Sequence, residues 1–182
     1  METDYLSLAL GLLGSILFII TCFSIKRSRI LTFGVIGSVL FIGSYIAKSD
    51  ITTAAIVLTA VTRNVLFMIE HNGLWKWLTR TRIILMMAIL IIGTWLLTVG
   101  LSDWQWYKLL VLAAPLALLY GLSLDNILHL KILTMLNALC WLTYEALTGA
   151  YTIMIGEIFG LIMVLFAIIR VARKTKIPKV LL

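Results

Sequence analysis

Long apolar stretches, each about as long as a membrane-spanning helix, restrict the fold of this chain more than any other feature. A helix needs about 20 apolar residues to cross about 30 Å of lipid hydrocarbon. Hydrophobic residues make up 62% and charged residues 13% of the 182 residues, whereas soluble domains average about 45–50% and about 25%. The sequence therefore predicts an all-α membrane protein with seven transmembrane helices, at approximately 5–25, 29–47, 51–69, 82–101, 107–124, 127–147 and 150–170.

Basic residues concentrate in alternate connections between these stretches. Cytoplasmic loops of membrane proteins are enriched in Lys and Arg, so the pattern predicts an outer N-terminus and a cytoplasmic C-terminus. The predicted cytoplasmic residues are Lys26, Arg27, Arg29, Lys76, Arg80, Arg82, Lys131, Arg170, Arg173, Lys174, Lys176 and Lys179. The outer connections hold only Lys48 and Lys108, and Arg63 lies inside the third stretch. This distribution also argues against nucleic-acid binding, despite the net charge of +7.

The first three stretches match the last three in length and loop spacing when the sequence is shifted by 99 residues. Three is an odd number of spans, so a further span must lie between the triplets to give both the same orientation. Parallel repeats of this kind are related by an axis along the membrane normal. The predicted divisions are a first repeat at 1–70, an inner loop and linker helix at 71–105, a second repeat at 106–170 and a basic cytoplasmic tail at 171–182.

Several short runs in both triplets carry a resemblance to a known family. They are Gly43-Ser44-Tyr45, Thr62-Arg63-Asn64-Val65-Leu66-Phe67, Cys140-Trp141-Leu142-Thr143-Tyr144, Gly149-Ala150-Tyr151 with Glu157, and Ile168-Ile169-Arg170. With these runs the chain resembles the YgjV-type bacterial inner membrane proteins over nearly all of its length. That family is related in fold to the SWEET and PQ-loop transporters. The resemblance implies a 3+1+3 helix arrangement in the bacterial inner membrane, and it implies no substrate.

One departure from the related transporters concerns the Pro-Gln pair that ends the first helix of each PQ-loop repeat. The corresponding positions hold Phe23-Ser24-Ile25 and Leu122-Ser123-Leu124. Such a proline is thought to act as a hinge, so alternating access by that hinge is in doubt for this chain. Pro115 inside the fifth stretch lacks a backbone N–H and could bend that helix instead, or it could form a static kink of the kind that membrane helices tolerate.

Two ionisable residues lie deep in the predicted membrane spans. Arg63 is about twelve residues into the third stretch, roughly 18 Å from its outer end. Glu157 lies in the seventh stretch with an axial offset of about 7–8 Å from Arg63 under the repeat. Charged residues at such depths are expensive and face the protein interior or water. Either the two form a buried ion pair that joins the triplets, or Arg63 extends its side chain to the inner membrane interface, or both line a central pathway and bind a solute or a proton.

The sixth stretch carries Asn137, Trp141 and Tyr144 on one helical face, at spacings i, i+4 and i+7. An amide, an indole and a phenol in a row form a surface suited to stacking on and hydrogen bonding to a small solute. The alternative is that Asn137 bonds between helices and Tyr144 anchors at the membrane interface. The full set of predicted substrate-binding residues is Ser38, Tyr45, Arg63, Asn64, Asn137, Trp141, Tyr144 and Glu157.

The expected function is transport or facilitated passage of a neutral or zwitterionic metabolite, such as a sugar, a nucleoside or a vitamin-like compound. The alternative is a non-transporting membrane protein that binds a partner or a lipid. No catalytic motif, cofactor motif or metal-ligand spacing is present in the sequence, so neither an enzyme nor a cofactor is expected. The expected partners are the lipid bilayer and a small solute, and a homodimer is left open.

Overall fold

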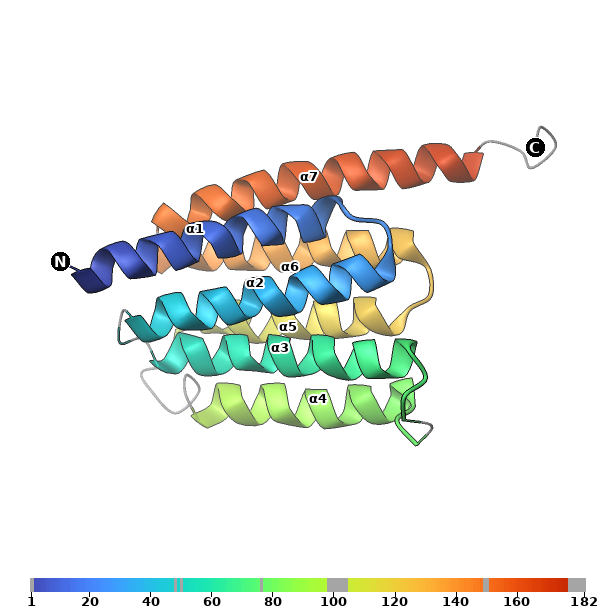
Figure 1. Cartoon of the computed structure of the whole chain (residues 1–182), viewed down its shortest axis with the longest axis horizontal. Helices are drawn as coiled ribbons and strands as arrows, with labels where there is room; N and C mark the ends of the chain where they lie inside the picture. Colours follow the sequence, from blue (N-terminus) through green and yellow to red (C-terminus); the bar gives the residue numbers. More distant parts are fainter. Residues whose placement is uncertain are drawn as a thin grey trace.

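The computed structural model describes residues 2–47, 49, 51–75, 77–97, 105–148 and 151–176, and the regular structure within these ranges is entirely helical. The helices follow the predicted order closely. They are α1 (Glu2–Phe23), α2 (Arg27–Ala47), α3 (Ile51–His71), α4 (Arg80–Trp95), α5 (Lys108–Ser123), α6 (Ile127–Thr148) and α7 (Tyr151–Lys176). They lie alongside one another in a bundle, and α1 begins at the opposite end from the one where α7 finishes (Figure 1). The predicted all-helical fold class is confirmed.

Helix length separates the seven described helices into two groups. Five contain segments long and apolar enough to cross a membrane, in α1, α2, α3, α6 and α7. The described parts of α4 and α5 are shorter, at 16 residues each. The predicted fourth span, 82–101, is thus described only as far as residue 97, and residues 98–104 lie outside the described ranges.

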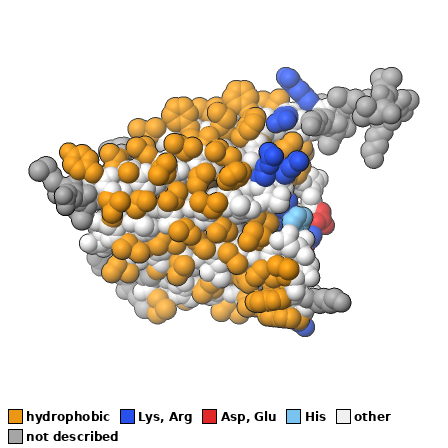
Figure 2. All heavy atoms as spheres, viewed as in Figure 1, with side chains coloured by type: hydrophobic (Ala, Val, Ile, Leu, Met, Phe, Trp, Pro, Cys, Tyr) orange, Lys and Arg blue, Asp and Glu red, His pale blue; other side chains and the backbone are white. Residues whose placement is uncertain are grey.

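The bundle exposes large hydrophobic side chains along its length and carries basic residues at one end. Figure 2 shows a hydrophobic face, with Lys and Arg gathered at the end where the C-terminal helix finishes. Leu12, Ile89 and Leu97 are 58%, 72% and 79% exposed. Large hydrophobic side chains that cover most of the face in Figure 2 need an apolar solvent, and lipid tails provide one.

The helices pack mainly with their neighbours in the chain. α2 lies between α1 and α3, α6 lies between α5 and α7, and α1 packs against α7. α4 packs against α3 and α5. Adding 99 to the first residues of α2 and α3 gives 126 and 150, one residue before α6 and α7 begin. The helix register therefore agrees with the sequence repeat, while the rotational 3+1+3 relation between the triplets stays a prediction.

Small residues allow α7 to approach α1 closely. A Cβ atom on Gly156 would lie 2.9 Å from the hydroxyl of Ser15, and one on Gly160 would lie 2.6 Å from the ring of Phe18. Close approach is the usual consequence of two small residues four apart on a membrane helix. The contact joins the first helix of the chain to the last and so closes the bundle.

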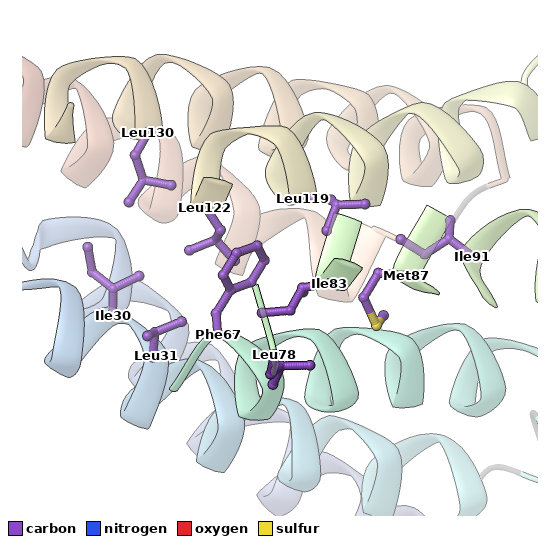
Figure 3. Packing of buried hydrophobic residues seen from close by; sticks show 10 residues of the cluster. All are labelled: Ile30, Leu31, Phe67, Leu78, Ile83, Met87, Ile91, Leu119, Leu122 and Leu130. Carbon is purple, nitrogen blue, oxygen red and sulfur yellow. The ribbon is translucent and has the colours of Figure 1, made fainter. Parts of the chain in front are cut away.

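An apolar cluster holds α4 against the rest of the bundle. Phe67 of α3 is completely buried and lies among Leu78, Ile83 of α4 and Leu122 of α5 (Figure 3). Ile83 is also completely buried. Apolar packing thus fills the space beside α4, and the cavity described next is lined by the other six described helices.

Candidate functional site

A cavity of about 150 Å³ lies inside the bundle and is lined by six of the seven described helices. α6 contributes the most polar side chains, α2 and α3 contribute two each, and α1, α5 and α7 complete the lining. Seven of the eight predicted site residues line this cavity: Ser38, Tyr45, Arg63, Asn64, Asn137, Trp141 and Glu157. Their role in binding a solute stays a prediction, but the structure places them around one space.

The remaining predicted site residue, Tyr144, has other neighbours. It packs against the cluster of Ile56, Trp95 and Val111, and its ring lies 6.0 Å from the rings of Tyr107 and of Trp141. Among the described residues that line the cavity it does not appear. The row of three predicted for α6 therefore divides, with Asn137 and Trp141 at the cavity and Tyr144 beside it.

Arg63 is buried, and within the described part of the chain it has no counterion. Its side chain is 4% exposed, and no carboxylate of the described residues lies within 4.0 Å of its nitrogens. Its hydrogen bonds are long: Nε and Nη2 donate to Oδ1 of Asn64 at 3.4 and 3.5 Å, and Nη1 donates to the backbone oxygen of Pro115 at 3.5 Å. A guanidinium has five N–H donors, so much of its bonding capacity is left over.

Glu157 faces the same cavity from α7 and also keeps bonding capacity. Its Oε2 atom is buried and has no hydrogen-bond partner within the described part of the chain. It forms no ion pair with Arg63 there, because the two are separated by more than 4.0 Å. Of the interpretations of this pair, the structural ion pair is wrong, and both residues instead line one cavity.

Two ionisable residues at the cavity were not recognised from the sequence. Lys131, which the sequence assigns to the cytoplasmic basic residues, is 1% exposed and lines the cavity from α6; its cytoplasmic assignment stays a prediction. Glu145, also on α6, is 5% exposed and lines the cavity as well. The available signal was their position inside an apolar stretch, since an intramembrane ionisable residue indicates a functional site by default.

The ionisable groups of the cavity balance in formal charge. Arg63 and Lys131 are basic, and Glu145 and Glu157 are acidic. Lys131 and Glu145 are 14 residues apart on α6, which is about 21 Å along a helix at 1.5 Å per residue. The cavity lining therefore runs along most of α6 with a cation near one end and a carboxylate near the other.

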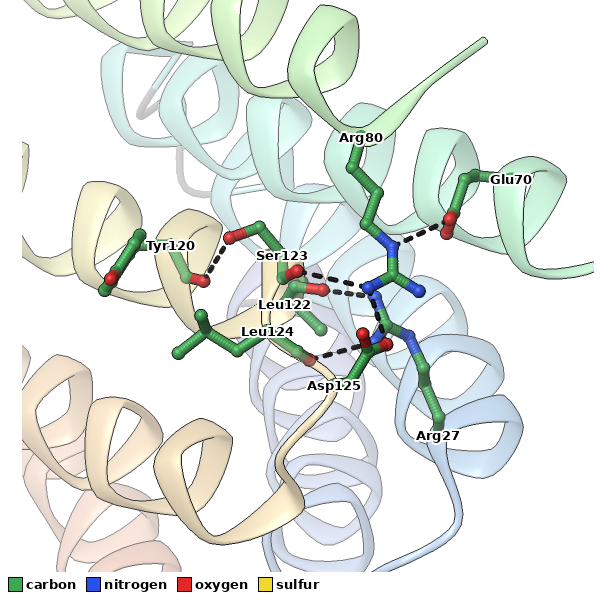
Figure 4. Close-up of polar contacts among 8 residues, drawn as sticks. All are labelled: Arg27, Glu70, Arg80, Tyr120, Leu122, Ser123, Leu124 and Asp125. Atoms are coloured by element: carbon green, nitrogen blue, oxygen red, sulfur yellow. Dashed lines mark hydrogen bonds and ion pairs between the residues drawn. The ribbon is translucent and has the colours of Figure 1, made fainter.

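At the end of the bundle near Lys131, basic side chains donate hydrogen bonds to the last backbone oxygens of neighbouring helices. Nζ of Lys131 donates to the backbone oxygens of Thr21 and Cys22 at the end of α1, at 3.0 and 2.7 Å. Arg27 of α2 donates to the backbone oxygens of Leu122 and Leu124 at the end of α5 (Figure 4). The last carbonyls of a helix have no partner within the helix, and cations are favoured there.

A third basic residue extends this network to α3. Nε of Arg80 donates to Glu70 at 2.8 Å, and Nη1 donates to Asp125 at 2.5 Å and to the backbone oxygen of Ser123 at 3.4 Å (Figure 4). The side chain thereby links α3, the start of α4 and the connection from α5 to α6. This end of the bundle is held by side chains from distant parts of the chain.

The apolar exterior, the helices of membrane-spanning length and the polar cavity inside them define a polytopic α-helical membrane protein. The sequence also matches the model of the bacterial inner membrane protein family Imp-YgjV over residues 5–175. The chain belongs to this family, as the resemblance of its short runs indicated, and it is an inner membrane protein. No curated protein and no solved structure matches the chain.

Proposed function

We propose that this protein moves a small neutral or zwitterionic solute across the inner membrane, with the cavity as its central site. The observation that carries the proposal is the convergence of polar side chains from both predicted triplets on one space. Arg63 and Asn64 reach it from α3, Asn137 from α6 and Glu157 from α7. Placing polar groups in membrane helices costs free energy. Gathered around a cavity, these groups can replace the hydrogen bonds that a solute loses when it leaves water.

The composition of the lining supports solute binding. Small-molecule sites are mostly apolar and aromatic, with a few polar groups that fix orientation. This cavity combines the rings of Phe41, Tyr45 and Trp141 with the amides of Asn64 and Asn137. The rings offer stacking surfaces, and the two amides, both 6% exposed, offer hydrogen-bond donors and acceptors.

The proposed orientation follows the distribution of basic residues. Lys26, Arg27, Arg29 and Arg80 lie near the end where α1 and α5 finish and α2 and α4 begin. Because basic residues favour the cytoplasmic side, we place this end in the cytoplasm and the N-terminus outside. The helix-end contacts of Arg27 and Lys131 then lie at the cytoplasmic end of the cavity, and a transport cycle would have to open them.

A stabilisation screen followed by a transport assay tests the proposal. The full chain, purified in detergent, is heated with sugars, nucleosides, amino acids and vitamin-like compounds. The expected result is that one class raises the melting temperature, and that Asn137→Ala weakens the effect. Thr143→Ala is the matched control, because Thr143 is exposed on the same helix and bonds to its own backbone at Leu139.

The transport step uses the stabilising solute in proteoliposomes. Preloaded vesicles are expected to accumulate labelled solute by counterflow, and vesicles with the Asn137→Ala variant are expected to accumulate less. Stabilisation without counterflow would contradict transport and would favour a membrane protein that binds a partner or a lipid.

A further inference from the structure

Two ionisable side chains at the cavity, of opposite formal charge, keep unused bonding capacity within the described part of the chain. They are the guanidinium of Arg63 and the carboxylate of Glu157. We propose that the solute is a small amino-acid-type zwitterion, whose carboxylate binds Arg63 and Asn64 and whose ammonium binds Glu157. This inference rests on the proposed function and names the substrate class of the same site.

Arg63 is the cation of the cavity that is available to an anion. The other cation, Lys131, uses its ammonium in two hydrogen bonds of 2.7 and 3.0 Å to the end of α1. The contacts of Arg63, at 3.4 to 3.5 Å, are at or beyond the long end of ordinary hydrogen bonds. A planar guanidinium matches a carboxylate with two parallel N–H···O bonds. A buried guanidinium that has no acidic partner among the described residues is therefore suited to a carboxylate from the solute.

Asn64 is held beside Arg63 by the neighbouring helix. Gly34 of α2 leaves room for it, since a Cβ atom there would lie 2.7 Å from Nδ2 of Asn64. Oδ1 of Asn64 accepts from Arg63, and Nδ2 lies beside Gly34, which also lines the cavity. This leaves Nδ2 as a second donor for the solute. The anion site thus consists of a guanidinium and an amide from consecutive residues of α3.

Glu157 provides the complementary charge for an ammonium. Its buried Oε2 atom has no hydrogen-bond partner in the described ranges, and a buried carboxylate oxygen in that state is expensive. Since Arg63 and Glu157 do not meet, a solute that carries both charges can neutralise each of them. A neutral solute would neutralise neither, and a singly charged solute would leave one charge without a partner.

The size of the cavity agrees with a solute of this class. One water molecule needs about 10–15 Å³ of the volume open to the centre of a water-sized sphere. By that measure the cavity, at about 150 Å³, holds on the order of ten waters. An amino acid has a comparable number of non-hydrogen atoms. The aromatic rings of Phe41 and Trp141, which also line the cavity, can contact its side chain.

The test compares each zwitterion with two analogues that lack one charge. Leucine is compared with 4-methylpentanoate and isoamylamine. The second set compares 4-aminobutyrate with butyrate and butylamine. The two zwitterions differ in the separation of their charged groups. Binding to the purified full chain is measured by thermal stabilisation. We expect at least one zwitterion to bind, and each of its singly charged analogues to bind roughly tenfold or more weakly, because each leaves one buried charge unpaired.

Two variants make the assignment of each charge specific. In Glu157→Gln the zwitterion is expected to lose its advantage over the carboxylate analogue. In Arg63→Gln it is expected to lose its advantage over the amine analogue. This crossed pattern cannot arise from general loss of structure, which would weaken all solutes alike. Arg29→Gln, at an exposed position of α2, is the control and is expected to retain the unmodified preference.

The outcomes distinguish this inference from the proposed function. If a sugar or nucleoside binds and shows counterflow while zwitterions do not, the substrate class is wrong and transport stands. If a carboxylate analogue binds as tightly as its zwitterion, the ammonium site at Glu157 is wrong. If no solute of any class binds or is transported, both proposals are wrong.

Discussion

The ammonium of Lys131 lies 2.7 Å from the backbone oxygen of Cys22, 109 residues earlier in the chain. Arg27 makes the reciprocal contact, reaching the backbone oxygens of Leu122 and Leu124. In both cases a basic residue on the middle helix of one predicted triplet caps the first helix of the other. The two contacts join the halves of the bundle at one end and satisfy carbonyls that a helix end leaves open.

Replacing Lys131 with Met is expected to destabilise the protein by about 1–3 kcal/mol. The change keeps most of the side-chain volume but removes the donor to two carbonyls at the end of α1, which are then buried without that partner. Thermal or denaturant unfolding in detergent measures the effect. Arg29→Met, at an exposed position of the same end, is the control and is expected to change stability by less than about 0.5 kcal/mol. Equal stability of the two variants would show that the cap contributes little.

The two carboxylates bonded to Arg80 are expected to differ in importance. The side chain of Glu70 is 17% exposed and that of Asp125 is 83% exposed. Since water screens exposed ion pairs strongly, Asp125→Asn is expected to cost less than about 0.5 kcal/mol and Glu70→Gln about 1 kcal/mol or more. Double-mutant cycles with Arg80→Gln measure both interaction energies. A larger coupling for Asp125 than for Glu70 would contradict the prediction.

Adding a methyl group at Gly34 is expected to disturb the site more than the fold. In Gly34→Ala the new Cβ atom would lie 2.7 Å from Nδ2 of Asn64, so the amide has to move within the cavity. The expected result is at least a severalfold weaker affinity for whichever solute the screen identifies. Gly93→Ala is the matched control, because a Cβ atom there has no neighbour within 4 Å and Ala favours a helix over Gly by about 0.5–1 kcal/mol. Unchanged affinity in Gly34→Ala would argue against a role for Asn64.

Gly160→Ala is expected to destabilise the contact between α1 and α7. The added Cβ atom would lie 2.6 Å from the ring of Phe18, and overpacking of this kind typically costs about 1–3 kcal/mol. The measurement is unfolding of the purified variant beside Gly93→Ala. Combining Gly160→Ala with Phe18→Leu is expected to recover part of the loss, because the smaller side chain leaves space for the methyl group. A double variant no more stable than Gly160→Ala alone would contradict this explanation.

The predicted orientation is tested with reporters fused after Leu182. Green fluorescent protein at the C-terminus is expected to fluoresce, and alkaline phosphatase there is expected to be inactive, because the basic tail should remain in the cytoplasm. The opposite result with both reporters would invert the assignment of the two bundle ends. It would also place the contacts of Arg27 and Lys131 on the outer side.

Sequence patterns predicted the helices well and the side-chain contacts poorly. The expected spans 29–47 and 127–147 differ from α2 and α6 by two residues or fewer at each end, because apolar length and polar connections are local properties. Arg63 and Glu157 were expected to face the protein interior or water, and both line one cavity. Whether these two residues form an ion pair could not be predicted. Their depth along the helix axes does not specify how far apart the two helices lie or which way each is rotated. The same reason explains why Tyr144, in line with Asn137 and Trp141 along α6, packs beside the cavity.

By itself, the sequence determined that this chain is a helical membrane protein. Its apolar stretches match the thickness of a bilayer, and that match depends only on composition and length. The tertiary structure alone decided that Lys131 caps α1, that Glu145 faces the cavity, and that Arg63 and Glu157 are separate charges across one space. These relationships depend on how helices from distant parts of the chain pack together. The shapes of the side chains in contact determine that packing, and sequence patterns do not show which side chains meet.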